Sequence, residues 1–304
     1  MKILIFGQGQ LGTYYKNYYV AKGDTVISDR VDIRDVEAVR TAVETATPDL
    51  VINAAAKTDI DWCEQHRTEA FEVNTLGADN VAAACAATGT YLYQISSGCV
   101  QESKSAEEVH TEDEPPTPLC FYSWTKVWAE NLVLDRVRRQ GLQALILRPR
   151  QLLSATVSPR NAVTKFLTYK KFIDTPNSCT IVEDLLDVTD QLVARRVTGV
   201  YNVVNPGIIT PFQVATMLKE IVKPEMEFVK ISKDELNAMT LATRVDCVLS
   251  GARLEGLGIH LKEIHERLRE ILHLFKENLA AGESAAAMAK TEADTAHKLS
   301  LVQE

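Results

Sequence analysis

The first twelve residues restrict the fold of this chain more than any other stretch does. Lys2–Phe6 is an apolar, partly β-branched run, as expected for a strand buried on both faces. A glycine-rich turn follows at once, and residues 13–20 can continue as a helix. In this context glycines let the backbone approach a pyrophosphate, and the helix N-terminus offers N–H donors. The sequence therefore predicts a dinucleotide site, with a ligand-free tight turn as the alternative, formed by Gly7, Gly9, Gln10, Leu11 and Gly12.

Beyond this turn, strand-like apolar runs alternate with helical stretches. Strands are predicted at residues 25–28, 49–53, 91–95 and 144–147, and helices at 35–46, 62–88 and 122–140. Such alternation indicates an α/β fold with a doubly wound parallel sheet, because each helix carries the chain back to the next parallel strand. Ligands then lie at the carboxyl ends of the strands.

The regular alternation ends near residue 148, and this change predicts two domains. The dinucleotide-binding domain is expected at residues 1–148 plus 181–204, and a smaller substrate-binding lobe at 149–180 plus 205–277. A short basic helix is expected at 163–171, and residues 103–118, with three prolines, are expected to form a surface loop. Residues 278–304 are expected to be a mobile or helical tail. A cleft between two lobes is the usual place for a ligand.

Charged residues follow the second predicted strand. Asp29 can hold a ribose 2′-hydroxyl, whereas Arg30 can pair with a 2′-phosphate, so the choice between NADH and NADPH stays open. Asp32 and Ile33 can flank the adenine. The alternative for the charged side chains is simple solvation of a loop.

Small and polar residues continue this predicted cofactor site. Ala54, Ala55 and Ala56 end the third strand, where small side chains let a cofactor lie close to the backbone or merely pack the strand end. Asn74 is either a buried polar residue with local partners or a residue that steadies backbone or water near Tyr122 and Lys126, and it is also a candidate for cofactor binding.

Tyr122 and Lys126 are four residues apart on a predicted helix, so they share one face of it. A phenol titrates near pH 10, and a neighbouring ammonium is expected to lower its pKa toward neutrality. Such a pair can deliver a proton to a carbonyl oxygen while a hydride reaches the carbonyl carbon. The spacing alone also arises by chance. Ser97 and Cys99, at the end of the fourth strand, are placed where chemistry is expected.

Composition excludes several classes of function. A net charge of −8 disfavours nucleic acid and anionic membranes as partners, and no apolar run is long enough to span a bilayer. The six cysteines show no Cys-x-x-Cys pair and no clustering with histidine, so neither a metal site nor a disulfide framework is expected. Reduced cytoplasm is therefore the expected location.

Several short patterns, taken together, resemble a known family. Gly9–Gly12, Asn53–Ala56, Glu72–Asn74, Ser96-Ser97 and the Tyr122–Lys126 pair resemble the extended short-chain dehydrogenase/reductases of the dTDP-4-dehydrorhamnose reductase branch. Within this branch, the bifunctional 3,5-epimerase/4-reductases of nucleotide 4-keto-6-deoxyglucose share further patterns, namely Asp61-Trp62-Cys63-Glu64, Gly98-Cys99, Phe121-Tyr122-Ser123, Pro159-Arg160-Asn161, Thr164-Lys165 and Pro176-Asn177-Ser178. The resemblance covers residues 1–276, and it departs from the family in a glycine turn one residue shorter.

The resemblance implies a Rossmann-type fold and a particular chemistry. It implies reduction of the C4 ketone of a nucleotide-linked 4-keto-6-deoxy sugar, with NADPH or NADH as cofactor. Tyr122 would protonate the ketone oxygen, and Ser97 would hydrogen-bond the same oxygen. Lys126 would tune Tyr122 and hold the nicotinamide ribose, so that Tyr122 and Lys126 also belong to the expected cofactor site. For a 3,5-epimerase activity it implies Cys99 and Lys165, with Lys165 as the base and Cys99 as the acid. UDP and dTDP both remain open as the nucleotide, and a homodimer is compatible with the family.

Three residues of the smaller lobe are candidates for substrate binding. Asn161, Asn177 and Arg244 can contact the base or the diphosphate, or can make structural hydrogen bonds. The competing functions are a 4-reductase without epimerase activity and a non-catalytic, reductase-like regulatory subunit. A 4,6-dehydratase is disfavoured because Gly98-Cys99 stands where that enzyme carries Asp-Glu.

Overall fold

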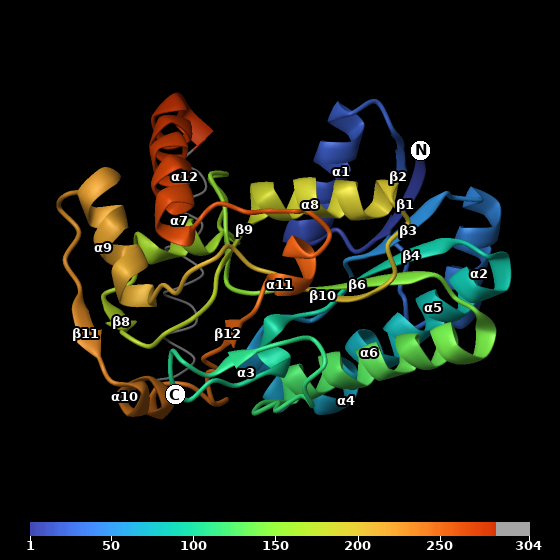
Figure 1. Cartoon of the computed structure of the whole chain (residues 1–304), viewed down its shortest axis with the longest axis horizontal. Coiled ribbons are helices and arrows are strands. Elements are labelled where there is room, and N and C mark those ends of the chain that lie inside the picture. Colours follow the sequence, from blue (N-terminus) through green and yellow to red (C-terminus); the bar gives the residue numbers. More distant parts are fainter. Residues whose placement is uncertain (284–304) are drawn as a thin grey trace.

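A six-stranded parallel sheet forms the centre of the molecule (Figure 1). The computed structural model describes residues 1–283. The strands lie in the order β10-β6-β4-β3-β1-β2, and every neighbouring pair is parallel. Their bounds are β1 Lys2–Phe6, β2 Thr25–Ile27, β3 Leu50–Asn53, β4 Tyr91–Ile95, β6 Ala144–Pro149 and β10 Gly199–Val203. The predicted doubly wound sheet is confirmed, and its strand order reverses between β1 and β3, where such sheets bind ligands.

Helices bury both faces of this sheet, because alternate strand residues point to opposite sides. Ile3 and Ile5 of β1 join a core with helices α1 and α8, whereas Leu4 and Phe6 join a core with α2, α5 and α6. The bounds of these helices are α1 Gln10–Ala21, α2 Val36–Ala46, α5 Gly77–Thr88, α6 Phe121–Gln140 and α8 Val182–Ala194. Burial on both sides explains why the strands consist almost entirely of apolar residues.

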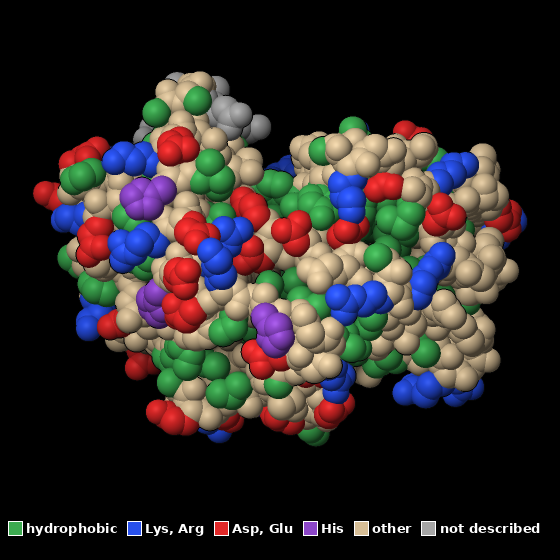
Figure 2. All heavy atoms as spheres, turned by 45° about the horizontal axis from the view of Figure 1, so that its top comes forward, with side chains coloured by type: hydrophobic (Ala, Val, Ile, Leu, Met, Phe, Trp, Pro, Cys, Tyr) green, Lys and Arg blue, Asp and Glu red, His purple; other side chains and the backbone are tan. Residues whose placement is uncertain are grey.

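A second group of elements has its own apolar core beside the carboxyl end of the sheet, on the left in Figure 1. It includes α7 Ala162–Phe166, α9 Pro211–Ile221, α10 Lys233–Ala238 and α12 Ile264–Asn278, and the parallel pairs β8 Lys171–Ile173 with β11 Val229–Ile231 and β7 Leu152–Leu153 with β9 Thr180–Ile181. Figure 2 shows the outline of the molecule indented between this group and the sheet. The predicted domain boundaries stay a prediction.

Two predicted helices are shorter than expected. The stretch 62–88 divides into α3 Ile60–Gln65, α4 Arg67–Phe71, a π-helical turn at Glu72–Leu76, and α5. The break lies at His66, whose backbone is non-helical (φ −120°, ψ 51°) and whose ring stacks on Trp62 at 4.4 Å between centroids. Similarly, the helix expected at 163–171 ends at Phe166, and the chain then extends into β8.

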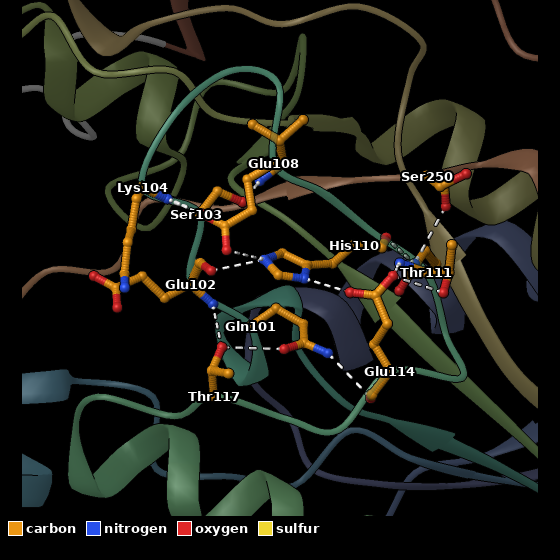
Figure 3. A network of polar contacts seen from close by, with 12 residues as sticks. Gln101, Glu102, Ser103, Lys104, Glu108, His110, Thr111, Glu114, Thr117 and Ser250 are labelled. Carbon is orange, nitrogen blue, oxygen red and sulfur yellow. Dashed lines mark hydrogen bonds and ion pairs between the residues drawn. The ribbon is translucent and has the colours of Figure 1, made fainter.

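The stretch 103–118 is not the simple surface loop that its prolines predict. β5 Val109–His110 pairs with β12 Val248–Leu249, and the His110 side chain is 8% exposed. Figure 3 shows the reason, since His110 lies between Glu114 Oε2 and the Glu102 carbonyl, each 2.7 Å from a ring nitrogen. Polar side chains of the loop therefore satisfy one another inside the protein. The loop in turn supports the backbone at Gly98–Val100, next to the carboxyl end of β4.

Acidic and basic side chains are interspersed over the face that Figure 2 shows. No helix among residues 1–283 has both the length and the apolar character needed to cross a bilayer. Of the predicted tail, Asn278, the last residue of α12, and the short π-helical turn Leu279–Glu283 belong to the described part, and residues 284–304 lie outside it.

Candidate active site

Three adjoining cavities lie at the carboxyl ends of β1, β3, β4 and β6. An outer cavity of about 780 Å³ and one of about 480 Å³ are both lined by the glycine turn and by the residues after β2 and β3. An inner cavity of about 270 Å³ extends from Gly9 to Tyr122 and Lys126. Gly9 and Ala56 line all three, so the cavities form one continuous cleft across the strand ends.

The glycine turn owes its shape to close backbone packing. Gly7 has φ +95°, and a Cβ there would lie 2.5 Å from the Ala55 nitrogen. A Cβ on Gly12 would lie 1.9 Å from the Gly7 carbonyl oxygen. Gly9, in contrast, has nothing within 4 Å of such a Cβ and precedes the first turn of α1. The turn is therefore packed against backbone at Gly7 and Gly12 but open at Gly9, and this open side suits the close approach of a phosphate chain.

The predicted adenosine contacts lie at the outer end of this cleft. Asp29 and Arg30 are exposed and line the outer cavity, with Arg30 also lining the second one. Asp32 is held by Arg34 through a 2.6 Å ion pair, which lowers the pKa of the Asp32 carboxyl. Ile33 is buried and also lines the second cavity. Both side chains that could distinguish NADH from NADPH are thus available to a ligand.

Asn74 makes contacts that fit both alternatives, local hydrogen bonds and a link to the helical turn between Tyr122 and Lys126. Its Oδ1 accepts from the Lys57 amide at 2.7 Å, and its Nδ2 donates to the Lys57 carbonyl at 2.9 Å. Nδ2 also donates to the Thr125 hydroxyl at 3.1 Å. Asn74 therefore ties the loop after β3 to the helix that carries Tyr122. Any direct contact of Asn74 with a cofactor stays a prediction.

The inner cavity brings together Ser97, Cys99, Tyr122 and Lys126. Ser97 lies just after β4, and its Oγ accepts a hydrogen bond from the Cys99 amide at 3.2 Å. Tyr122 and Lys126 come from the first turns of α6, and the Tyr122 hydroxyl is hydrogen-bonded to Ser97. Two elements adjacent in space thus bring a serine, a phenol and an ammonium to one cavity, as the Tyr-x-x-x-Lys spacing predicts.

The predicted pKa shift of Tyr122 is wrong in direction. Burial raises the pKa of this phenol above its ordinary value, with a smaller contribution in the same direction from Cys99. Burial also lowers the pKa of Lys126 to about 8, against an opposing effect of Glu130. The Lys126 ammonium donates to the Ile95 carbonyl at 3.0 Å. Desolvation therefore outweighs the charge effect that the sequence suggests.

A buried ion pair between Glu130 and Arg148 lies next to Lys126, and it was not predicted from the sequence. Arg148, on β6, donates to the two carboxylate oxygens of Glu130 at 2.9 and 2.6 Å, and the Ser96 hydroxyl donates to the same carboxylate. Glu130 stands one helical turn beyond Lys126. The four-residue spacing of Lys126 and Glu130 could have indicated from the sequence that the two share a helix face. The pairing of Glu130 with Arg148, in contrast, depends on the tertiary fold.

A fourth cavity, of about 290 Å³, adjoins the inner one through Cys99, Arg150 and Gln151. Its other lining residues include the aromatic rings of Phe166, Tyr169 and Phe172 and the cationic side chains of Lys171 and Arg244. Arg244 also pairs with Asp61 at 2.6 Å. The cleft therefore continues past Cys99 into the second group of elements.

The remaining predicted residues separate into two groups. Asn161 is 0% exposed and caps α7, and its Nδ2 donates to two backbone carbonyls, so its packing favours the structural alternative over substrate contact. Asn177 is equally buried, between Arg150 and Asp246. Lys165 lines the outer cavity beside the glycine turn, whereas Cys99 lines the inner and fourth cavities. The structure therefore places these two residues in neighbouring parts of one cleft.

The chain is similar to known proteins in sequence and in structure. The RmlD substrate binding domain family matches residues 1–277. A bifunctional dTDP-4-dehydrorhamnose 3,5-epimerase/dTDP-4-dehydrorhamnose reductase of Arabidopsis thaliana is 29% identical over 286 residues, which are 90% of this chain and 93% of the relative. The L780 UDP-rhamnose synthase of Acanthamoeba polyphaga mimivirus superimposes with a TM-score of 0.82 at 25% identity, over 90% of this chain and 99% of that one. A dTDP-4-dehydrorhamnose reductase of Clostridium acetobutylicum gives 0.81 at 27% identity, over 91% and 100%.

Proposed function

The chain belongs to the RmlD substrate binding domain family, the dTDP-4-dehydrorhamnose reductases among the extended short-chain dehydrogenase/reductases, and we propose that it reduces the C4 ketone of a nucleotide-linked 4-keto-6-deoxy sugar with NADPH or NADH. The observation that carries this proposal is the inner cavity, where Ser97, Tyr122 and Lys126 meet beside the open glycine turn. A ketone bound there would face a proton donor on one side and the cofactor cleft on the other.

The cleft fits a nicotinamide dinucleotide. The open face at Gly9 would receive the pyrophosphate, and Asp29 and Arg30 would contact the adenosine ribose or its phosphate. Ala54, Ala55 and Ala56 present small side chains along the middle of the cleft. When bound, the cofactor supplies the hydride for C4.

Tyr122 is the proton donor in this proposal. Burial keeps its phenol protonated at neutral pH, which is the form that a reduction requires. The Ser97 hydroxyl would hydrogen-bond the same substrate oxygen and so orient the ketone. The Lys126 ammonium, buried nearby, would stabilise the negative charge that develops on that oxygen as the hydride arrives.

The fourth cavity would hold the nucleotide end of the substrate. Phe166, Tyr169 and Phe172 offer aromatic faces for a pyrimidine base, and Lys171 and Arg244 offer cations for a diphosphate. Because the cavity joins the inner one at Cys99, a nucleotide sugar could place its base there and its ketone at Tyr122. Neither feature distinguishes uracil from thymine.

A cofactor-consumption assay tests this function. Purified protein is mixed with NADPH or NADH and with UDP- or dTDP-4-keto-6-deoxyglucose, and with the corresponding 4-keto-L-rhamnose nucleotide as an already epimerised substrate. Loss of the reduced-nicotinamide absorbance with at least one ketone supports a reductase. Tight binding of these nucleotides without any oxidation of the cofactor would instead indicate a non-catalytic regulatory subunit.

A second candidate activity is 3,5-epimerisation of the same sugar before reduction. It is favoured by the position of Cys99 between the inner and fourth cavities, with Lys165 in the adjoining part of the cleft. The bifunctional Arabidopsis relative, matched over 93% of its length, is named for both activities. Replacing Cys99 by Ala is expected to abolish solvent deuterium exchange at C3 and C5 but to preserve reduction of the epimerised ketone. Retained exchange would remove Cys99 from the scheme.

A further inference from the structure

Arg150 is a buried cation that neither the fold nor the proposed reduction explains. It follows β6, its side chain is 8% exposed, and it lines both the inner and the fourth cavity. Within residues 1–283, no carboxylate lies within ion-pair distance of its guanidinium, and its Nε has no hydrogen-bond partner. Burying such a charge is costly unless a specific partner compensates it.

The partner that faces the cleft is the sulfur of Cys99. Arg150 Nη1 donates to Cys99 Sγ at 3.2 Å. Nη2 donates to Asn177 Oδ1 at 2.6 Å and to the Val245 carbonyl, so the plane of the guanidinium is fixed from the other side. The side-chain stem packs against Gly98, where an added Cβ would lie 3.1 Å from the Arg150 Cβ. The guanidinium is therefore held in place to donate to this one thiol.

A fixed cation that donates to sulfur favours the thiolate over the thiol. Burial raises the pKa of the other five thiols, to about 12 for Cys63, Cys179 and Cys247. The charge of Arg150 lowers the pKa of the Cys247 and Cys179 thiols, but burial raises it by more. Cys99 combines a direct hydrogen bond from Arg150 with a position on two cavities.

We propose that Arg150 is a positioning residue that holds Cys99 as a thiolate, so that Cys99 is the base of the 3,5-epimerisation. This inference rests on the second proposed activity and reverses the sequence-based roles of Cys99 and Lys165. The thiolate takes a proton from C3 or C5, the C–H electron pair forms a C=C bond to C4, and the carbonyl π electrons move to O4. Lys165 then returns a proton to the opposite face, and the C=O bond re-forms.

The other groups around Cys99 are compatible with an anionic sulfur. Tyr122 faces it from α6, Cys120 lies just before that helix, and Cys247 lies before β12. Burial keeps all three protonated, and a charge on Cys99 raises the pKa of Tyr122 further. Ser97 contributes a neutral hydroxyl. Arg150 is thus the cation in contact with this sulfur within the described residues.

The rate of alkylation of Cys99 by iodoacetamide tests the thiolate without any substrate. Peptide mass spectrometry assigns the label in the full-length protein and in its Arg150→Met variant over a range of pH. We expect Cys99 to react about tenfold or more slowly in the variant near neutral pH, with the midpoint of its pH profile displaced upward. Equal rates and midpoints in the two proteins would overturn the role of Arg150.

Two controls separate this effect from general loosening of the fold. Loosening would speed the labelling of Cys179 and Cys247, whereas the proposal predicts slower labelling of Cys99 and continued protection of these two. If Arg150→Met does not fold, Arg150→Gln takes its place, because its amide keeps N–H donors for Asn177 Oδ1 but carries no charge. Slower labelling of Cys99 in that variant supports the proposal, and an unchanged rate overturns it.

Solvent deuterium exchange at C3 and C5 then tests the catalytic step. Arg150→Met is expected to slow the exchange in the wild-type background but to add no further loss in the Cys99→Ser background. A rise in KM for the nucleotide sugar with unchanged labelling of Cys99 would show instead that Arg150 holds the diphosphate. No exchange in the wild-type protein would overturn the epimerisation, while the labelling still decides how Arg150 acts on the thiol.

Discussion

Removing the hydroxyl of Tyr122 is the sharpest change that a single residue offers. The side chain is 7% exposed and makes one polar contact, to Ser97, so Tyr122→Phe should keep the fold. Because the phenol is the proposed proton donor, we expect kcat for ketone reduction to fall about 10²–10⁴-fold with little change in KM. Tyr18→Phe, which removes a hydroxyl of α1 that donates to Asp187 of α8, is the matched control and should leave kcat unchanged.

The lowered pKa of Lys126 predicts a pH dependence. Its folded-state pKa is about 8, below the ordinary value of 10.5, and only the ammonium stabilises the developing oxyanion. We therefore expect kcat/KM to be constant at lower pH and to fall as pH rises through about 8. Lys126→Arg, which keeps its charge, should move this fall to higher pH, and a profile unchanged by that substitution would rule Lys126 out as its source.

The effect of Lys126 protonation on stability has the opposite pH dependence, so a loss of activity above pH 8 can be told apart from unfolding. Between pH 8 and 10.5 the unfolded chain binds a proton at Lys126 more strongly than the folded chain does. The contribution of Lys126 to the free energy of unfolding therefore rises with pH over this range. We therefore expect activity to fall as the pH rises through 8, while the midpoint of urea-induced unfolding stays the same or increases.

For single residues, the sequence predicted which side chains form the candidate site, but it did not predict how deeply they are buried or what they contact. The spacing of Tyr122 and Lys126 placed both in one cavity with Ser97, as the sequence indicates. The direction of the Tyr122 pKa shift was wrong because burial is a property of the tertiary fold. Arg150 could not be recognised from sequence, since its contact with Cys99 joins residues that are 51 positions apart.

At the scale of elements, the turn between β1 and α1 can be tested with a pair of glycines. Gly7 and Gly23 both have positive φ, but only Gly7 would place a Cβ against neighbouring backbone. Gly23→Ala should cost about 1–2 kcal/mol of unfolding free energy from strain alone. Gly7→Ala should cost more and should also weaken NADPH binding, measured by urea denaturation and by titration. Equal losses in both variants would show that the close packing at Gly7 does not matter.

The ion pair between α6 and β6 gives a second test. Glu130 and Arg148 are both about 5% exposed as side chains, so Glu130→Gln leaves a buried cation without its partner. A loss of about 3–5 kcal/mol in unfolding free energy is expected. The exposed pair of Asp135 with Arg139 on the same helix is the control, and Asp135→Asn should cost less than about 1 kcal/mol. Chemical denaturation of both variants distinguishes these outcomes.

Elements were predictable where one local pattern dominates. The apolar runs at β1, β3, β4 and β6 identified the parallel sheet, because burial on both faces requires such runs. The break at His66 was not predictable, because the residues around it contain no proline or glycine that would end a helix. The loop at 103–118 looks exposed by composition, yet its polar groups satisfy one another around His110 (Figure 3).

At the scale of the whole molecule, the cleft is built from segments distant in the chain. The glycine turn, the end of β4 and the start of α6 meet at the inner cavity, and Arg244, which pairs with Asp61, lines the fourth cavity. Sequence predicted the sheet side of this cleft well, because nucleotide-binding turns are local patterns. The opposite side consists of short elements with few local signals, and there the burial of Asn161 and Asn177 favours the structural alternative.

The central claim is that the protein transfers a hydride from a nicotinamide cofactor to C4 of a nucleotide 4-keto-6-deoxy sugar. The most direct measurement uses NADPH or NADH deuterated at the transferred position and locates the label in the product by NMR. We expect one deuterium at C4 of the product sugar, formed in step with oxidised cofactor, and none with Tyr122→Phe at matched times. A product without deuterium at C4, or an unreacted ketone with every nucleotide and cofactor combination, would contradict it.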